Sequence, residues 1–187
     1  EGLERQVAER TAQLEQRAGE LAIINGIQQA MAAELDFLSI VDLVGDQLHE
    51  VFKDAGAGVA ISLLDEVNGL VRYVYMRDAK GQHEAGGTIP YLREHPVQRA
   101  INRHETVHAR DQNAAREWGF ARAADGKAPS EPCSILAVGV FGSRARLGGI
   151  MLSTKRDHAF TDSLVRLLET IASSMGVALE NARLFQE

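Results

Sequence analysis

The chain has 187 residues, 45% of them apolar and 25% charged, so it can form one globular domain with a helical extension and is not a disordered segment. Its net charge of -6 comes without a clustered Lys/Arg face, which argues against nucleic acid as a partner because phosphate-backbone binding needs a basic surface. No stretch reaches the ~18 consecutive apolar residues of a membrane span, so we expect no direct membrane contact in this segment.

Residues 1–33 are predicted to form one long helix that pairs in a coiled coil. Two sets of apolar residues recur at heptad spacing, as in a two-stranded coiled coil: Val7, Leu14 and Leu21, with Leu3, Ile24 and Met31 on the companion positions. Arg10 and Arg17 interrupt the companion set. They are typical of a marginally stable coil that can slip or rotate, or, more simply, of a solvated helix face.

A second helix and a first hairpin follow. Asp36 is a good N-cap, and the apolar residues of 37–52 return at spacings of three and four, which predicts a helix with one buried face. The apolar runs 58–64 and 70–76 flank a turn and predict an antiparallel hairpin.

The middle of the chain contains a short helix, a short strand and a long connection. His95-Pro96 opens the helix, because proline is well tolerated at the first helical position, and 106–109 is a brief strand. Residues 111–132 are polar and rich in alanine; a connection of this length is typical of a lid, a binding loop or a hidden helix. The runs 135–141 and 147–154 predict a second hairpin.

The last helix is predicted to begin at its cap, Thr161, and to run to the end of the chain. Its apolar residues alternate at spacings of four and three, which indicates a second coiled-coil seam. We therefore expect a homodimer through the N- and C-terminal helices, parallel or antiparallel, and a last helix that continues toward an output domain. The candidate dimer contacts are Val7, Leu14, Leu21, Leu164, Leu168, Ile171, Met175, Ala178 and Phe185.

Two stretches in the second half of the chain resemble a GAF domain. Ser134–Phe141, rich in small residues, and the glycine-containing Leu147–Ser153 are similar to the central hairpin of that family. The helix after Phe160-Thr161-Asp162 is similar to the family's exit helix, and its closing Glu180-Asn181-Ala182-Arg183-Leu184 is among the more specific strings of such modules. Gly139 departs from the family, in which many members have proline at this position.

The N-terminal helix has a resemblance of its own. Leu3-Glu4, Val7–Thr11 and Leu14-Glu15 resemble the signalling-helix linkers found between sensor domains and histidine kinase or cyclase modules. The two resemblances imply an α+β, PAS-like fold with a six-stranded antiparallel sheet, helices paired on one face and a ligand cavity on the other. They divide the chain into a linker, 1–33, a sensor core, 34–163, and an exit helix, 164–187.

Cys133 is the single cysteine, and it limits the chemistry that the family resemblance allows. It favours a reducing, cytoplasmic location, since no disulfide can form within the chain. Bilin-binding relatives attach the chromophore through a cysteine, commonly beside a histidine, whereas Cys133 is followed by Ser134 and opens a strand. We therefore expect no covalent bilin. Relatives that reduce methionine sulfoxide need more than one cysteine, so we expect no enzyme activity from this chain.

Two other kinds of site are disfavoured. Cyclic-nucleotide-binding relatives carry Asn-Lys, a later Phe and an Asp-Glu pair, where this chain has Thr154-Lys155, Phe160 and Leu164-Val165. His104 and His108 are four residues apart, but a break falls between them, so they do not share one helix face and predict no metal site.

If the family cavity exists, the bend before the short helix and the long connection form its walls. Side chains with an aromatic body and a polar tip suit a mostly apolar pocket that needs a few orienting hydrogen bonds. The candidate ligand residues are Tyr75 (or Tyr73), Tyr91, His95, Trp118, Phe120 and Cys133. Each of Tyr73, Tyr75 and Phe120 can equally be a core residue, and Cys133 a small buried one.

These features indicate the sensory domain of a larger signalling protein, which binds an unidentified small molecule and passes its state through dimeric helices to an output module. A histidine kinase is the first choice for that output, with a nucleotide cyclase or a transcriptional activator behind it. The alternative is a structural dimerisation and relay module with a collapsed cavity.

Overall fold

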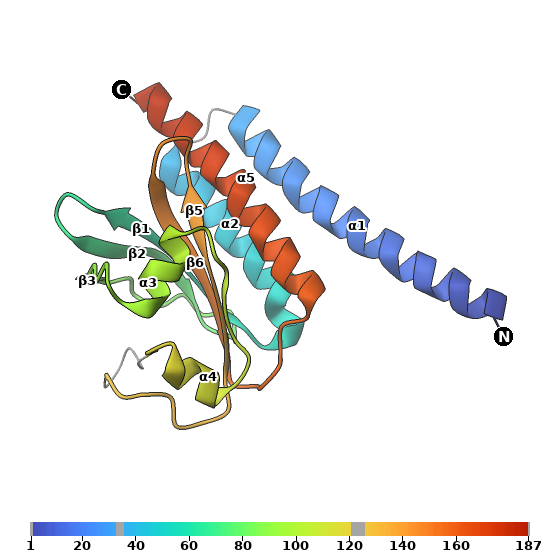
Figure 1. Cartoon of the computed structure of the whole chain (residues 1–187). Coiled ribbons are helices and arrows are strands. Elements are labelled where there is room, and N and C mark those ends of the chain that lie inside the picture. Colours follow the sequence, from blue (N-terminus) through green and yellow to red (C-terminus); the bar gives the residue numbers. More distant parts are fainter. Residues whose placement is uncertain (1, 33–35, 121–125, 187) are drawn as a thin grey trace.

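Six strands form one antiparallel sheet in the order β3-β2-β1-β6-β5-β4 (Figure 1). They are β1 Gly58–Asp65, β2 Leu70–Arg77, β3 Thr88–Pro90, β4 Val107–Ala109, β5 Ser134–Phe141 and β6 Arg146–Thr154. The helices are α1 Gly2–Ala32, α2 Phe37–Phe52, α3 Pro96–Asn102, α4 Gln112–Glu117 and α5 Asp162–Gln186, with a 3-10 turn at Lys53–Ala55. This computed structural model describes residues 2–32, 36–120 and 126–186. The expected α+β fold with a six-stranded antiparallel sheet is confirmed.

The two predicted hairpins form the centre of the sheet, where β1 pairs with β6. Residues 134–138 of β5 are all buried, because helices cover both faces of the sheet. A strand buried on both faces carries a near-continuous apolar run instead of an alternating one. This explains why the second hairpin is so apolar in the sequence.

The cap and the buried face of α2 are as predicted. Asp36 Oδ1 accepts a hydrogen bond from Ser39 N at 3.0 Å, which satisfies an N–H of the first turn. Ile40, Val44 and Leu48 are almost fully buried in the main core between α2, α5 and the sheet. Burial of each such side chain contributes about 1.5–3 kcal/mol to the stability of the fold.

The apolar stripe of α5 points into the chain's own core. Leu168, Ile171 and Met175 are 0% exposed, and Ala178 is 1% exposed. The prediction that these four residues form the dimer seam is therefore wrong, because a side chain without accessible surface cannot contact a second copy. Spacings of three and four are common to coiled-coil seams and to core-facing helix stripes, so the sequence pattern alone does not separate them.

The first half of α1 runs clear of the rest of the chain (Figure 1). Residues 2–19 are all exposed, whereas Ile23 is buried against the main core. Val7, Leu14 and Leu21 are 58%, 65% and 58% exposed. The predicted α1 seam is thus not covered by the chain itself.

Some predicted contacts lie outside what the structure describes. The side chains of Met31 and Phe185 are among these, while Leu164 is half-buried and packs against the main core. In the described parts of the chain, no helix is both long and apolar enough to cross a membrane.

The long connection contains a helix. Asp111 caps α4 by accepting a hydrogen bond from Ala114 N at 2.8 Å, so the hidden-helix alternative holds for Gln112–Glu117. Residues 121–125 of the same connection lie outside the described residues.

Candidate functional site

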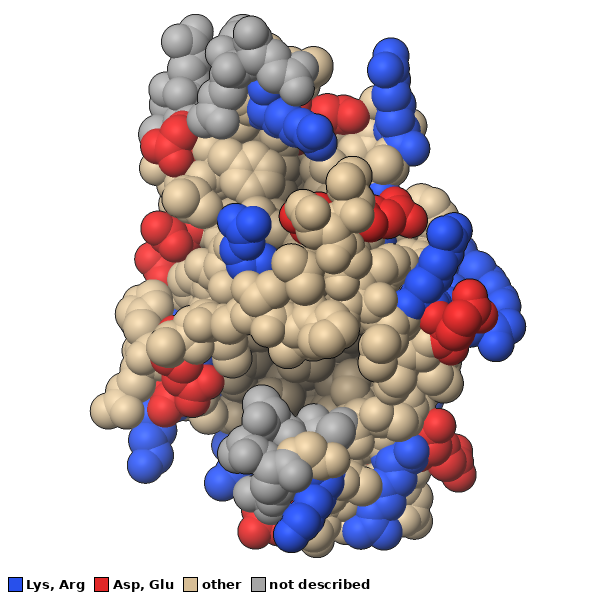
Figure 2. Space-filling model, turned by 90° about the vertical axis from the view of Figure 1, so that its left-hand side faces the viewer, with Lys and Arg blue, Asp and Glu red and all other residues tan. Residues whose placement is uncertain are grey.

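The face of the sheet opposite α2 and α5 is covered by α3 and α4, and this is where the ligand site is predicted. Ala137 of β5 packs against Ile101 of α3, which fixes the direction of this face. Directly paired residues of neighbouring strands share a face, so its floor also includes Ala60, Ser62, Gly139, Gly149 and Met151. Most of these residues are small. Figure 2 looks onto this side of the molecule and shows a hollow with uncharged residues above it and at its sides.

His95 joins the two short helices that border this face. Its Nδ1 accepts a hydrogen bond from Val97 N at 3.3 Å and so caps α3. Its Nε2 lies 3.2 Å from the carbonyl oxygen of Gly119, just beyond α4. A neutral imidazole that accepts at Nδ1 carries its proton on Nε2, so Nε2 donates to Gly119. His95 therefore has a positioning role between α3 and α4.

Trp118 and Phe120 pack on the floor of the site. Both are half-buried, and both contact the apolar clusters under α3 and under α4 together with Met151. Cys133 packs against the α4 cluster, and burial raises the pKa of its thiol. A thiol with a raised pKa is a poor nucleophile. The structure thus brings Trp118, Phe120 and Cys133 together, with His95 beside them.

A polar cluster lies at the C-terminal end of α3. Arg146 Nη1 donates to Gln98 Oε1 at 2.7 Å and to Asn102 Oδ1 at 3.1 Å, and Arg146 Nε donates to Gly148 O at 2.9 Å. Asn102 Nδ2 donates to the hydroxyl oxygen of Tyr91 at 2.7 Å. Burial lowers the pKa of Arg146. Tyr91 therefore lies beside Arg146 and Asn102, in a group whose other members the sequence did not reveal.

Gln98, Asn102 and Arg146 carry no recognisable signal in the sequence. Arg146 lies in the turn predicted between the runs 135–141 and 147–154, where a charged residue usually faces solvent. Gln98 and Asn102 are four residues apart on α3, which puts them on one side of that helix. Only the packing of α3 against β5, the strand paired with β6, shows that this side meets Arg146.

Tyr73 and Tyr75 point to opposite faces of the sheet. Tyr75 pairs with Ile61, Tyr73 pairs with Ser62, and the register shifts between these two pairs. Since Ile61 and Ser62 are consecutive in β1, their side chains point to opposite faces, and so do those of their partners. Tyr73 therefore faces the candidate site. The prediction that Tyr75 lines the site is wrong, because Tyr75 faces α2.

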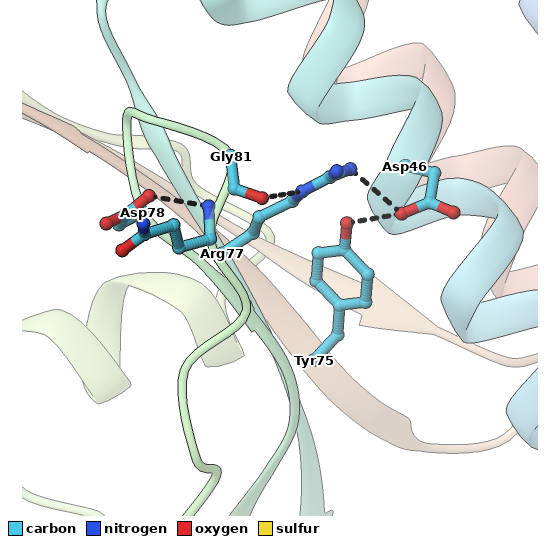
Figure 3. A network of polar contacts seen from close by, with 6 residues as sticks. Asp46, Tyr75, Arg77, Asp78 and Gly81 are labelled. Atoms are coloured by element: carbon cyan, nitrogen blue, oxygen red, sulfur yellow. Dashed lines mark hydrogen bonds and ion pairs between the residues drawn. The ribbon is translucent and has the colours of Figure 1, made fainter.

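Tyr75 belongs to a network on the helix side of the sheet (Figure 3). Its hydroxyl donates to Asp46 Oδ1 at 2.7 Å, and Arg77 Nη1 lies 3.2 Å from the same oxygen. Arg77 Nε donates to Gly81 O at 2.8 Å. This network ties α2 to β2 and to the turn after it. Burial, together with the hydrogen bond to Asp46, raises the pKa of Tyr75 to about 12.

We expect the Tyr75→Phe variant to lose about 1–2 kcal/mol of stability at neutral pH, because a hydrogen bond to a charged acceptor is removed while Asp46 remains accessible to water. Since the folded chain disfavours the phenolate, wild-type stability should fall as the pH rises from about 10 to 12. Ultraviolet titration of the tyrosines should show a phenol with a pKa of about 12 in the wild type only. A variant that retains this phenol would contradict the assignment.

His104 and His108 do not form a pair. The ring of His104 stacks on Phe141 with 3.8 Å between ring centroids, whereas His108 pairs with Leu136 and faces the helix side, near Phe160. Within residues 2–32, 36–120 and 126–186, no group of three His, Cys, Asp or Glu side chains could hold a metal ion.

A separate open groove of about 400 Å³ lies at the edge of β5, between α5 and the turn before β4. Its rim includes Glu105 and Glu169, and the Thr106 hydroxyl donates a hydrogen bond to Glu169. None of the candidate ligand residues lines it. The α3/α4 face therefore remains the candidate functional site.

The arrangement of this chain is similar to that of several solved GAF domains. One is the GAF domain of a phosphoenolpyruvate-protein phosphotransferase from Coxiella burnetii, with 17% identity, 90% of this chain and 97% of that chain covered, and a TM-score of 0.65. A methyl-accepting chemotaxis protein, residues 122 to 287, shows 16% identity over 88% of this chain and 98% of that chain, with a TM-score of 0.66.

A third similar structure is the phycocyanobilin-bound GAF domain from a cyanobacterial phytochrome, with 11% identity, 90% of this chain and 97% of that chain covered, and a TM-score of 0.67. At these identities the likeness shows the fold alone. No curated protein is similar enough in sequence to count as a relative. The family model described as GAF domain matches residues 34–180, which is most of the chain. The chain therefore belongs to the GAF domain family.

Proposed function

We propose that this GAF domain is the regulatory, small-molecule-sensing part of a larger signalling protein and has no chemistry of its own. The observation that carries the proposal is the α3/α4 face. It combines a floor of small residues and a hollow of uncharged surface with the aromatic side chains of Trp118 and Phe120 and the polar group around Arg146. Ligand sites of small molecules have this combination of apolar walls and a few polar groups. The similar domains from a chemotaxis protein and a phytochrome support a signalling role.

A contact between the sheet and α5 supports the transmission of a signal. Ser143 N donates to the two carboxylate oxygens of Glu180 at 2.9 and 3.0 Å, and Ser143 Oγ donates to Oε1 at 2.7 Å. These hydrogen bonds lower the pKa of Glu180 and favour its charged form. Ser143 lies in the turn that leads into Arg146. A ligand that moves this turn would therefore move α5, provided that it binds the two arrangements with unequal affinity.

The output module is proposed from the linker resemblance of α1. A histidine kinase is the first choice, and a nucleotide cyclase or a transcriptional activator is the alternative. The signal would pass along α1 and α5, which contact each other. In Figure 1 the C-terminal ends of both helices lie toward the top of the molecule.

A homodimer through α1 is part of the proposal. The exposed stripe of Val7, Leu14 and Leu21 supports it, because large apolar side chains in a heptad pattern favour a second helix over water. Among the described side chains of α5, Val177 and Leu184 are the exposed large apolar residues, and they lie seven positions apart. We propose these two residues, in place of the buried stripe, as the α5 contribution to the dimer.

We expect Leu14→Glu to dissociate the dimer, because it places a charge in the predicted seam. Sedimentation velocity should show a monomer at concentrations where the wild type is a dimer. Val67→Glu is the matched control, since Val67 is 96% exposed in the turn between β1 and β2, away from the seam. A Leu14→Glu variant that sediments like the Val67→Glu variant would rule out this seam.

Ligand sensing is tested by melting the purified chain with a library of bacterial metabolites. At about a hundredfold excess over its dissociation constant, a ligand should raise the Tm of the wild type by about 5–10 °C. Trp118→Ala should lose this shift and keep the dimer, and Trp118→Phe should keep part of the shift because an aromatic ring remains.

The second candidate function is a dimerisation and relay module that binds no ligand. It is favoured by the half-burial of Trp118 and Phe120, which already pack against the apolar clusters of the sheet. In that case no metabolite would shift the Tm, and Trp118→Ala would change only the stability of the fold.

A further inference from the structure

Arg146 places a positive charge on the α3/α4 face, and no described carboxylate lies within ion-pair distance of it. Its three hydrogen bonds described above go to neutral oxygens, those of Gln98, Asn102 and Gly148. None of the ion pairs found among the described residues includes Arg146. Neutral acceptors satisfy N–H groups but do not neutralise the charge, and Glu66 attracts Arg146 only from beyond ion-pair distance. A shielded charge without a directly contacting counter-charge is costly. The lowered pKa of Arg146 reflects this cost.

The free side of the guanidinium is directed at the floor of the site. The three hydrogen bonds use Nε and Nη1, and none of them involves Nη2. A Cβ atom placed on Gly149 would lie 3.4 Å from Nη2 and 3.8 Å from Ser62 Oγ. A side chain at Gly149 would therefore occupy the position that Nη2 and the Ser62 hydroxyl both border.

Tyr91 adds a further donor beside this space. Its hydroxyl interacts with Arg146, and its oxygen accepts a hydrogen bond from Asn102. A phenol that accepts in this way still has its own O–H to donate. A guanidinium with a fixed orientation and two nearby hydroxyls is the donor set that a carboxylate or phosphate group prefers.

We propose that the ligand of this domain is a small molecule with an anionic group, a carboxylate or a phosphate, which binds Arg146 Nη2 over Gly149. Gln98 and Asn102 are positioning residues that hold the guanidinium from α3. The uncharged part of the ligand lies against the apolar surface of the same face. This inference rests on the proposed sensing function and names the class of ligand. The competing explanation is that Arg146 only links β6 to α3.

Three probes with the same ring test the charge requirement: benzoate, phenyl phosphate and the neutral benzamide. Binding to the full chain is measured by isothermal titration calorimetry at constant ionic strength. We expect benzoate or phenyl phosphate to bind at least about tenfold more tightly than benzamide, since a charge-assisted hydrogen bond to arginine is stronger than a neutral one. The tighter of the two anions identifies the group.

Arg146→Gln should remove the preference for the anion and leave benzamide binding unchanged, and Arg146→Lys should retain part of it. Arg144→Gln is the matched control, because Arg144 is an exposed arginine of the same turn. Circular dichroism of each variant confirms that it is folded. Equal binding of all three probes, no binding of either anion, or an unchanged preference in a folded Arg146→Gln variant would overturn the proposal. The proposed sensing function has its own test, because it would be contradicted if no metabolite of any charge shifted the Tm.

Discussion

Replacement of Gly176 by alanine is expected to destabilise the chain by about 3 kcal/mol or more. Gly176 lies inside α5, where a Cβ atom would be only 2.0 Å from the carbonyl oxygen of Phe141 and 3.0 Å from its carbonyl carbon. These are backbone atoms of β5, so they cannot turn away as a side chain can. Either α5 or the β5–β6 hairpin would have to move. Urea denaturation followed by circular dichroism measures the effect.

Gly19→Ala is the control for this prediction. Gly19 also lies inside a long helix, α1, but nothing lies within 4 Å of a Cβ atom placed there. Alanine is the better helix former by about 1 kcal/mol, so this variant should be at least as stable as the wild type. If Gly176→Ala were tolerated as well as Gly19→Ala, α5 could not lie against β5 as described.

The second large effect is expected from Leu168→Ala, which should destabilise the monomer fold by about 2–5 kcal/mol. Leu168 is 0% exposed in the main core, and its truncation leaves a cavity under α5. The loss should be independent of protein concentration, because the contact lies within one chain. Urea denaturation at several concentrations tests both points.

Leu184→Ala, on the same helix, is the matched control. Leu184 is 66% exposed, so its truncation should change the stability of the monomer by about 0.5 kcal/mol at most. The proposed α5 contact predicts instead a weaker dimer, visible by sedimentation. The reverse result, with Leu168→Ala affecting only the dimer, would restore the seam that the sequence pattern indicated.

The elements with a strong local signal were predicted correctly. The cap Asp36 and the regular spacing after it determine α2, and the two central hairpins follow from apolar runs on either side of polar turns. The strand β3 has no such signal. It has three residues, all exposed, and it is held by its pairing with Leu70, Val71 and Arg72 rather than by burial of its own.

The candidate site was only partly predictable, for reasons of geometry. Tyr73 and Tyr75 are two residues apart, which in a regular strand places both side chains on the same face. Only the register shift opposite Ile61 and Ser62 turns them to opposite faces of the sheet. The apolar residues of α5 have spacings of three and four, which fit contact with a second copy as well as contact with the chain's own sheet. Arg146 becomes part of the site only because α3, from a distant part of the sequence, packs over it.

Native mass spectrometry of the purified chain, after incubation with an extract of bacterial small molecules, tests the central claim most directly. We expect the mass of a dimer plus a small molecule, with the additional mass absent from Trp118→Ala and Arg146→Gln. The mass of the bare protein, as a monomer or as a dimer, would contradict a ligand-sensing domain.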